Sequence, residues 1–267
     1  MKPLSISLAS EMIASVGPLE IRNTMLMAWL VMLTLFLGSF ALFTSGYKMI
    51  PGRAQAAIEL IINGLYDLFA SVVQDERLSR KFFPLVSTML IFIVLGNWMG
   101  ILPGVGSITI QAMHEGHMEA LPLFRSMNAD VNMTLSIAII AMLAVQFYGV
   151  FELGIVSYSA KFIVPPWKNP IQTFVGFLEL IGELSRIISF TFRLFGNIFA
   201  GEVLLIVISY LVPYIAPVPF LGMELFVGLI QGFVFALLTT VFLKIAVTEH
   251  EAHHDDESTP SITAPAV

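Results

Sequence analysis

One long apolar segment, residues 170–211, limits the folds open to this chain more than any other feature, because it carries charged side chains between Glu179 and Glu202. Its central part, Ser185 to Glu202, reads SRIISFTFRLFGNIFAGE and contains Arg186 and Arg193. An arginine does not lose its proton in a protein, so an arginine among membrane-buried residues is costly. We therefore expect the function of the chain to require a fixed positive charge within a membrane.

The composition is that of an all-α polytopic membrane protein. Hydrophobic residues make up 57% of the 267 residues, the mean hydropathy is +0.87 and only 12% of the residues are charged. So few charged residues could not cover the surface of a soluble protein. The net charge of −6 gives no indication of nucleic-acid binding, and the absence of cysteine excludes disulfides and thiolate metal sites. We expect a single membrane domain over residues 1–267.

Apolar stretches of about 20 residues, the length that spans a bilayer, predict about five membrane-crossing helices, and a further segment predicts one amphipathic surface helix. Asp130 is expected to cap the third crossing helix at its N-terminus. Residues 75–81 are expected to form a charged hinge, and residues 103–130 a loop. We predict crossing helices over 23–47, 82–102 and 131–151, the amphipathic helix over 54–74, a long tilted helix over 170–211, a return helix over 220–247 and a disordered cytoplasmic tail over 249–267.

The helix predicted over 170–211 is too long to stand upright in a membrane. About 40 residues at 1.5 Å each make ~60 Å of helix, twice the hydrocarbon thickness of ~30 Å. The helix must therefore be steeply tilted or broken. Pro213, Pro217 and Pro219 are expected to form the turn into the return helix, so that the two make a long hairpin.

Glu179, Arg186 and Arg193 follow one another at intervals of seven residues and share one face of the long helix. Glu183 lies within helical reach of Arg186, so this pair is either a structural ion pair or part of a functional site. Arg193 has no acid three or four residues away on either side. Glu202 points to another side of the helix.

In the return helix, Glu224 and Gln231 share a face, and Gly228 with Gly232 forms a G-x-x-x-G pattern that permits close helix approach. Glu202 and Glu224 are either ordinary partners across the hairpin or members of a proton relay. Two carboxyl groups that lie close together out of water share a proton more readily than both ionise.

The basic residues between the predicted helices indicate the orientation of the chain. Most of them fall on one side of the membrane if the N-terminus is outside, and cytoplasmic loops are the ones enriched in lysine and arginine. We therefore expect an external N-terminus and a cytoplasmic C-terminus. These loop residues are Lys48, Arg53, Arg77, Arg80, Lys81, Lys161 and Lys168, whereas the other side carries only Lys2, Arg22 and Arg125.

The central segment resembles the a subunit of F-type ATP synthases. Arg193-Leu194-Phe195-Gly196-Asn197, followed by Ala200-Gly201-Glu202, is similar to the central motif of that family, and so is the spacing from Arg193 to Gln231. Weaker similarity occurs at residues 95–97, 102–103 and 129–134. The resemblance implies a fold in which two long tilted helices curve around a rotating ring of c subunits.

The resemblance also implies the roles of individual residues. Arg193 would be the essential stator arginine that takes part in proton translocation. The half-channel to the outside would be lined by Asn197, Glu202, Glu224, Gln231, Asn97, Asp130 and Asn132, and the half-channel to the cytoplasm by Glu179, Ser185, Arg186 and Ser189. Some members of the family have a histidine at one of the positions of Glu202 and Glu224, and an acid at the position of Gly100.

The implied partners are the c-ring, the peripheral-stalk b subunits, the other subunits of ATP synthase and membrane lipid. A bacterial plasma membrane is the expected location. The sequence contains no phosphate-binding G-x-x-x-x-G-K-[ST] loop, so we do not expect this chain to be an enzyme on its own. His114 and His117, like the histidines of the tail, lie in predicted loops without a supporting framework, and we expect no metal and no cofactor.

The alternative function is that of a stand-alone ion channel or secondary transporter with an intramembrane Arg/Glu site. Such proteins are commonly built from inverted repeats with broken helices. The sequence has no internal repeat, which favours the stator subunit over the transporter.

Overall fold

The computed structural model describes residues 10–17, 19–44, 46, 51–102, 104–114, 117–162, 170–213 and 215–248. Helices make up most of these residues, and six of them are long and apolar enough to cross a membrane by length and composition. The chain is therefore an all-α multi-pass membrane protein, with two small hairpins. The six helices are α1 (Asn23–Thr44), α2 (Arg53–Val73), α3 (Glu76–Ile101), α4 (Val131–Leu153), α6 (Pro170–Leu211) and α7 (Pro217–Thr248).

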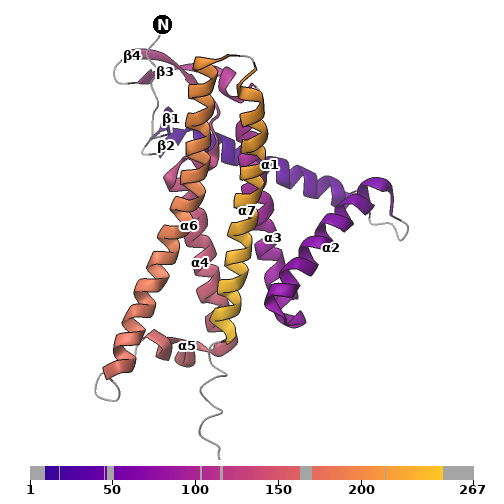
Figure 1. Ribbon diagram of the computed structural model, residues 1–267, viewed down its shortest axis with the longest axis vertical. Helices are drawn as coiled ribbons and strands as arrows, with labels where there is room; N and C mark the ends of the chain where they lie inside the picture. The colour runs from indigo at the N-terminus through magenta and orange to yellow at the C-terminus, as the bar shows by residue number, and fades with distance from the viewer. Residues whose placement is uncertain are drawn as a thin grey trace, which may run out of the picture.

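Helices α3, α4, α6 and α7 run side by side along the longest axis of the molecule and form its main bundle (Figure 1). Helix α1 leaves the upper part of this bundle at a steep angle, and α2 turns back towards the lower end of α3 (Figure 1). The short helix α5 (Ile155–Phe162) lies at the base of the bundle. By length and composition alone, α2 is a sixth candidate membrane span, whereas the sequence predicts five crossing helices. Helix α2 is the one that the sequence predicts to be amphipathic.

Two antiparallel hairpins lie near the upper end of the bundle (Figure 1). Strand β1 (Met12–Val16) pairs with β2 (Leu19–Arg22), and β3 (Thr109–His114) pairs with β4 (His117–Pro122). The prediction of a loop over 103–130 is therefore wrong for β3 and β4. Residues 109–112 do alternate polar and apolar side chains, the period of a strand, but over too short a run to predict one. Two 3-10 turns, η1 (Val105–Ser107) and η2 (Met127–Ala129), flank this hairpin.

Two helices begin earlier than their apolar cores suggest. Helix α3 begins at Glu76, because the side chain of Asp75 accepts a 3.0 Å hydrogen bond from the backbone N–H of Leu78 and caps the helix. The charged hinge predicted over 75–81 is thus mostly the first turns of α3. Helix α7 begins at Pro217, so the return turn is shorter than predicted. Proline, which has no N–H, is tolerated there because the first N–H groups of a helix have no partner within the helix. The predicted tail, 249–267, lies outside the described residues.

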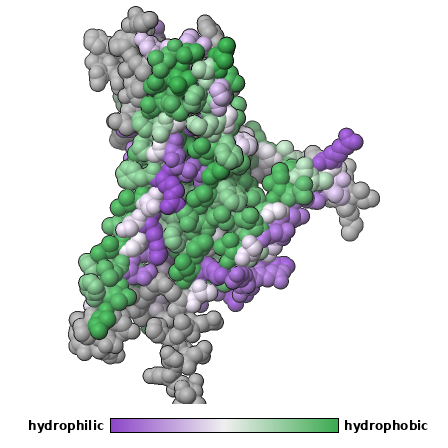
Figure 2. Space-filling view, in the orientation of Figure 1, coloured by the Kyte–Doolittle hydropathy of each residue, from purple (hydrophilic) through white to green (hydrophobic). Residues whose placement is uncertain are grey.

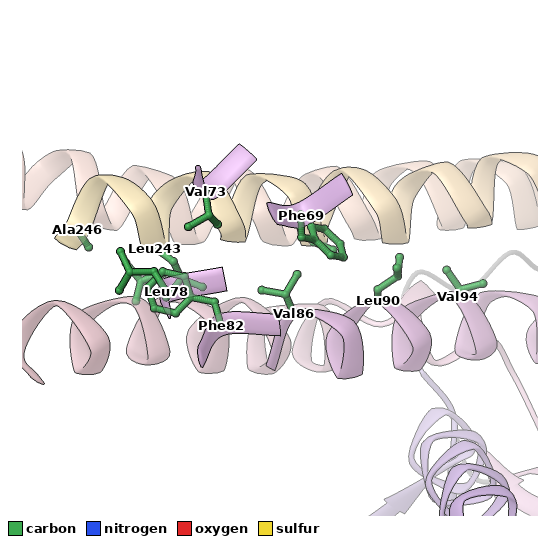
Figure 3. Close-up of a cluster of buried hydrophobic side chains, with 11 residues drawn as sticks. Phe69, Val73, Leu78, Phe82, Val86, Leu90, Val94, Leu243 and Ala246 are labelled. Carbon is green, nitrogen blue, oxygen red and sulfur yellow. The ribbon is translucent and has the colours of Figure 1, made fainter. Parts of the chain in front are cut away.

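Helix α7 packs tightly against α3, and α2 packs against both of them. Gly228 and Gly232 of α7 face α3, and a Cβ at these positions would come within 2.9 Å of the Asn97 Cβ and 2.6 Å of the Val94 Cγ2. The close approach predicted from the G-x-x-x-G pattern is therefore present, with α3 as the partner. Below this contact, a buried cluster joins the three helices (Figure 3) through Phe69, Val73, Leu78, Phe82, Val86, Leu90, Val94, Leu243 and Ala246.

Helix α6 is one continuous helix of 42 residues. At 1.5 Å per residue its length is ~63 Å, about twice the hydrocarbon thickness of a bilayer. The two alternatives that the sequence left open were a tilt and a break, and the structure has no break between Pro170 and Leu211. All the charged residues of the central segment therefore lie on one continuous helix.

Candidate functional site

The candidate site is built on α6, which presents its polar side chains in two groups with Arg193 between them. Glu179, Glu183 and Arg186 lie in its first half, and Glu202 lies in its second half. The 23 positions from Glu179 to Glu202 correspond to ~35 Å of helix. Figure 2 shows a narrow column of hydrophilic residues running lengthwise over the α6 side of the bundle, with hydrophobic surface on both sides.

The group in the first half of α6 is organised around Arg186. Its guanidinium forms an ion pair with Glu183 and lies 3.8 Å from a carboxylate oxygen of Glu179. The same guanidinium lies over the ring of Phe242 on α7, 4.7 Å from its centre. The positive charge of Arg186 is thus balanced within its own helix, as the spacing allowed. Ser185 and Ser189 are exposed beside it.

A cavity of about 500 Å³ opens next to this group, between α4, α5 and α6. Glu183 and Gln146 are polar residues on its wall, and the rest of its described lining is apolar. The ion pair of Arg186 and Glu183 therefore borders an open space on the lower part of the bundle. The full described lining is Ile139, Met142, Leu143, Gln146, Phe162, Leu180, Ile181, Glu183, Leu184 and Ile187.

Arg193 is half-buried and has a different environment from Arg186. Its guanidinium donates a 3.2 Å hydrogen bond to the hydroxyl of Ser189 and lies 5.8 Å from the centre of the Phe190 ring. Within the described part of the chain it forms no ion pair with a carboxylate. The sequence showed that α6 itself offers Arg193 no acid at helical spacing, and the fold brings none to it from another described helix.

The group in the second half of α6 lines a second cavity, of about 530 Å³. Glu202 of α6 and Glu224 of α7 both face it. Arg125, from the segment between β4 and η2, holds Glu202 through contacts of 2.9 Å and 3.2 Å from Nε and 3.2 Å from Nη2. The described lining comprises Gly100, Ile101, Leu102, Val105, Gly106, Pro122, Phe124, Arg125, Ser126, Ile198, Glu202, Leu205, Ile206, Ser209, Leu221 and Glu224.

Glu224 is only 3% exposed and fits against the backbone of α6 at Gly201. A Cβ at Gly201 would lie 1.8 Å from Oε2 of Glu224, so only glycine leaves room for this carboxylate. The two glutamates therefore reach the same cavity from adjacent helices.

Asn97 and Asp130 connect the helices around this cavity and are not among the described residues that line it. The side chain of Asn97, which is fully buried, donates to the backbone carbonyl of Gly228 at 2.9 Å and accepts from Asn128 at 2.6 Å. Asp130 caps α4 by accepting from the N–H of Asn132 at 2.9 Å, as predicted, and also accepts a 2.9 Å hydrogen bond from Thr24 of α1.

The other predicted residues of this group are more open. Asn132 and Asn197 are exposed, and Gln231 is half-buried on α7. None of the three is among the described residues that line the 530 Å³ cavity.

Sequence reasoning missed Arg125, Asn128 and Thr24 as partners of the site. Arg125 carried one signal that could have drawn attention to it, because it is the single lysine or arginine between residues 103 and 130. Asn128 and Thr24 carried none, since each reaches a partner on another element.

Comparison with known proteins identifies the family to which this arrangement belongs. The family model described as ATP synthase A chain matches residues 25–244, a range that includes every residue of the two groups and Arg193. The chain belongs to this family.

Subunit a proteins from several bacteria are similar to the chain over most of its length. It is 32% identical over 213 residues to ATP synthase subunit a of Campylobacter fetus subsp. fetus, covering 79% of this chain and 84% of that protein. It is 34% identical over 222 residues to ATP synthase subunit a 1 of Pelobacter propionicus, covering 83% and 86%. For ATP synthase subunit a of Geotalea daltonii the identity is 32% over 222 residues, with the same coverage. As a member of the subunit a family, the chain is a membrane component of the ATP synthase complex.

Proposed function

We propose that this chain is the proton-conducting stator subunit of an F-type ATP synthase, in which two offset half-channels and Arg193 couple proton flow to rotation of the c-ring. The observation that carries the proposal is the isolation of Arg193. On the same helix, Arg186 is balanced by Glu183 and Glu179, whereas the described residues give Arg193 no ion pair. A permanent cation in a membrane requires a counter-ion. A carboxylate brought by a rotor subunit would supply it.

The mechanism follows from how a carboxyl group responds to its surroundings. A rotor carboxyl that faces lipid stays protonated, because burial disfavours the charged form. Opposite Arg193 the anion is favoured, so the proton leaves through the half-channel to the cytoplasm. Rotation then brings the site to the other half-channel, where it takes up a new proton before it returns to lipid. The proposed cytoplasmic half-channel is bordered by Glu179, Ser185, Arg186 and Ser189.

The proposed half-channel to the outside is centred on the 530 Å³ cavity that Glu202 and Glu224 share. Its further residues are Asn97, Asp130, Asn132, Asn197 and Gln231. Arg193 lies between the two half-channels, about 10 Å along α6 from Arg186 and about 13 Å from Glu202. A fixed positive charge at this point repels protons, so protons cannot pass directly from one half-channel to the other.

In this proposal the N-terminus is outside and the C-terminus cytoplasmic, in a bacterial plasma membrane. The basic loop residues support that orientation, because residues 75–81 and 161–168 then both lie on the cytoplasmic side. The partners are the c-ring, the peripheral-stalk b subunits and surrounding lipid. The chain contributes no nucleotide site, and ATP is made elsewhere in the complex.

The decisive experiment replaces Arg193 in the assembled complex and follows ATP-driven proton pumping in inverted membrane vesicles. Arg193→Ala is expected to reduce pumping to background. Arg80→Ala is the matched control, because Arg80 pairs with Glu76 on the surface of α3, where both side chains are more than 70% exposed. Its effect should be small. Pumping that survives in Arg193→Ala would exclude the proposed role.

A purification tests the alternative of a stand-alone channel or transporter. In mild detergent, the stator subunit is expected to co-purify with a ring of small hairpin subunits and with soluble ATPase subunits. A self-sufficient oligomer of this chain that conducts ions alone would favour the alternative.

A further inference from the structure

The cavity shared by Glu202 and Glu224 contains an unequal pair of carboxyl groups. Among its described lining residues, the charged side chains are Arg125, Glu202 and Glu224, so one cation faces two potential anions. The elements that complete the wall, α3, η1 and the end of β4, contribute uncharged residues there. The position of Arg125 therefore decides which carboxyl group has its charge balanced.

The guanidinium of Arg125 is oriented toward Glu202. Its Nε and Nη2 both contact the carboxylate, and together they engage both of its oxygen atoms. This side-on contact of two donors with two acceptors is the strong, oriented form of an arginine–carboxylate pair. The side chain of Arg125 is 10% exposed and that of Glu202 is 26% exposed, so the pair is largely withdrawn from water. Removal of Arg125 would leave the carboxylate of Glu202 without this cation.

Glu224 has no comparable partner. It is more deeply buried than Glu202, and the structure gives it neither an ion pair nor a hydrogen bond to another described residue. Its carboxylate lies against Gly201, directly beside the position of Glu202 on α6. A buried carboxyl group with no cation of its own and a fixed anion nearby is well placed to bind and release a proton.

We propose that Arg125 is a positioning residue that keeps the carboxylate of Glu202 engaged in an ion pair, and that Glu224 is consequently the carboxyl group of this cavity that exchanges protons. This inference rests on the proposed function, because it assigns roles within the outer half-channel. The two glutamates are then not equivalent members of a relay. The ion pair of Glu202 with Arg125 has no net charge and forms one side of the cavity, and Glu224 carries the proton past this pair.

The test uses five variants of the assembled complex and one control variant in inverted vesicles, with ATP-driven pumping measured as a function of pH. Glu224→Gln is expected to reduce pumping by ~100-fold or more, the usual effect of removing a proton-transfer group. Arg125→Gln and Glu202→Gln each leave one unbalanced charge beside Glu224, of opposite sign. Each is expected to impair pumping, and their pH profiles should shift in opposite directions.

The double variant Arg125→Gln/Glu202→Gln removes both charges and is the decisive one. It is expected to recover pumping to within roughly twofold of the unaltered complex and to restore the pH profile. Arg125→Lys, which keeps the charge, should lose less than Arg125→Gln. Arg22→Gln is the matched control, because Arg22 pairs with Glu20 at 3.0 Å away from the cavity. The amount of chain in each purified complex is measured alongside, so that loss of assembly is recognised.

Two results would overturn the inference. If the double variant pumps no better than Glu202→Gln, then Glu202 itself carries the proton. If Glu224→Gln pumps normally, Glu224 is not the exchanging group. Failure of the proposed function has a different signature, namely normal pumping in Arg193→Ala.

Discussion

The side-chain amide of Asn97 on α3 donates a 2.9 Å hydrogen bond to the backbone carbonyl of Gly228 on α7, 131 positions later in the chain. The oxygen of the same amide accepts a 2.6 Å hydrogen bond from Asn128. Asn97, Asn128 and Gly228 are all buried. One side chain thus fixes the end of α3 to α7 and to η2, beside the cavity of the two glutamates.

Replacement of Asn97 by alanine should therefore destabilise the chain. The change leaves the buried amide of Asn128 without its acceptor, and a buried unsatisfied group costs ~1–3 kcal/mol. It also removes the hydrogen bond that joins α3 to the carbonyl of Gly228 on α7. The midpoint of thermal unfolding in detergent measures the effect. Asn63→Ala, on the exposed side of α2, is the control and should change stability by less than ~0.5 kcal/mol. Equal shifts for the two variants would contradict a structural role for Asn97.

Gly201→Ala tests the fit of Glu224 against α6. The new methyl group would lie 1.8 Å from Oε2 of Glu224, so the carboxylate must move. We expect proton pumping to fall at least ~10-fold, because proton transfer depends on placement within hydrogen-bond reach. Gly222→Ala is a matched control, since a Cβ there meets nothing within 4 Å. A Gly201→Ala complex that assembles and pumps as well as Gly222→Ala would show that this position of Glu224 is not needed.

Lys244→Met tests how α2 is attached to the bundle. The Nζ of Lys244 on α7 donates to the backbone carbonyl of Val72 at 3.1 Å and to the side chain of Gln74 at 3.2 Å. A cation at the C-terminal end of a helix satisfies free carbonyls and is worth up to ~1 kcal/mol. Hydrogen exchange of the last turn of α2 should therefore accelerate in Lys244→Met and remain slow in Lys244→Arg. Unchanged exchange in both variants would argue that apolar packing alone holds α2.

A double-variant cycle on Arg186 and Glu183 resolves whether their ion pair is structural. Glu183→Gln alone leaves Arg186 with the more distant Glu179 and should cost ~1–3 kcal/mol of stability. If the pair is structural, Arg186→Gln/Glu183→Gln recovers both stability and pumping, because neither member of the pair is left without the other. Stability that returns without pumping would instead assign Arg186 a direct part in proton transfer.

Much of the helical framework was predictable because local patterns determine it. The length of α6 followed from the absence of proline between Pro170 and Pro213, and the cap at Asp130 followed from its place before an apolar run. The ion pair of Arg186 with Glu183 followed from helical spacing. Each of these features involves residues that are close in sequence, where the geometry of one helix fixes the outcome.

The features that escaped prediction depend on contacts between distant parts of the chain. Arg125 and Glu202 are 77 positions apart, and neither has a sequence neighbour that indicates the other. The bonds of Asn97 likewise reach across helices. The hairpin of β3 and β4 was missed because each strand has only six residues and too short an alternation to be distinguished from a loop.

The continuity of α6 has a consequence for how its charges can vary. In an unbroken helix each residue adds about 1.5 Å of rise and about 100° of rotation, so the distances and directions from Arg186 to Arg193 and on to Glu202 are set by counting residues. Loss of a single residue between Arg193 and Glu202 would turn one of them away by more than a quarter of a circle. Along this helix, the number of positions between the charged residues cannot change without turning them away from their present directions.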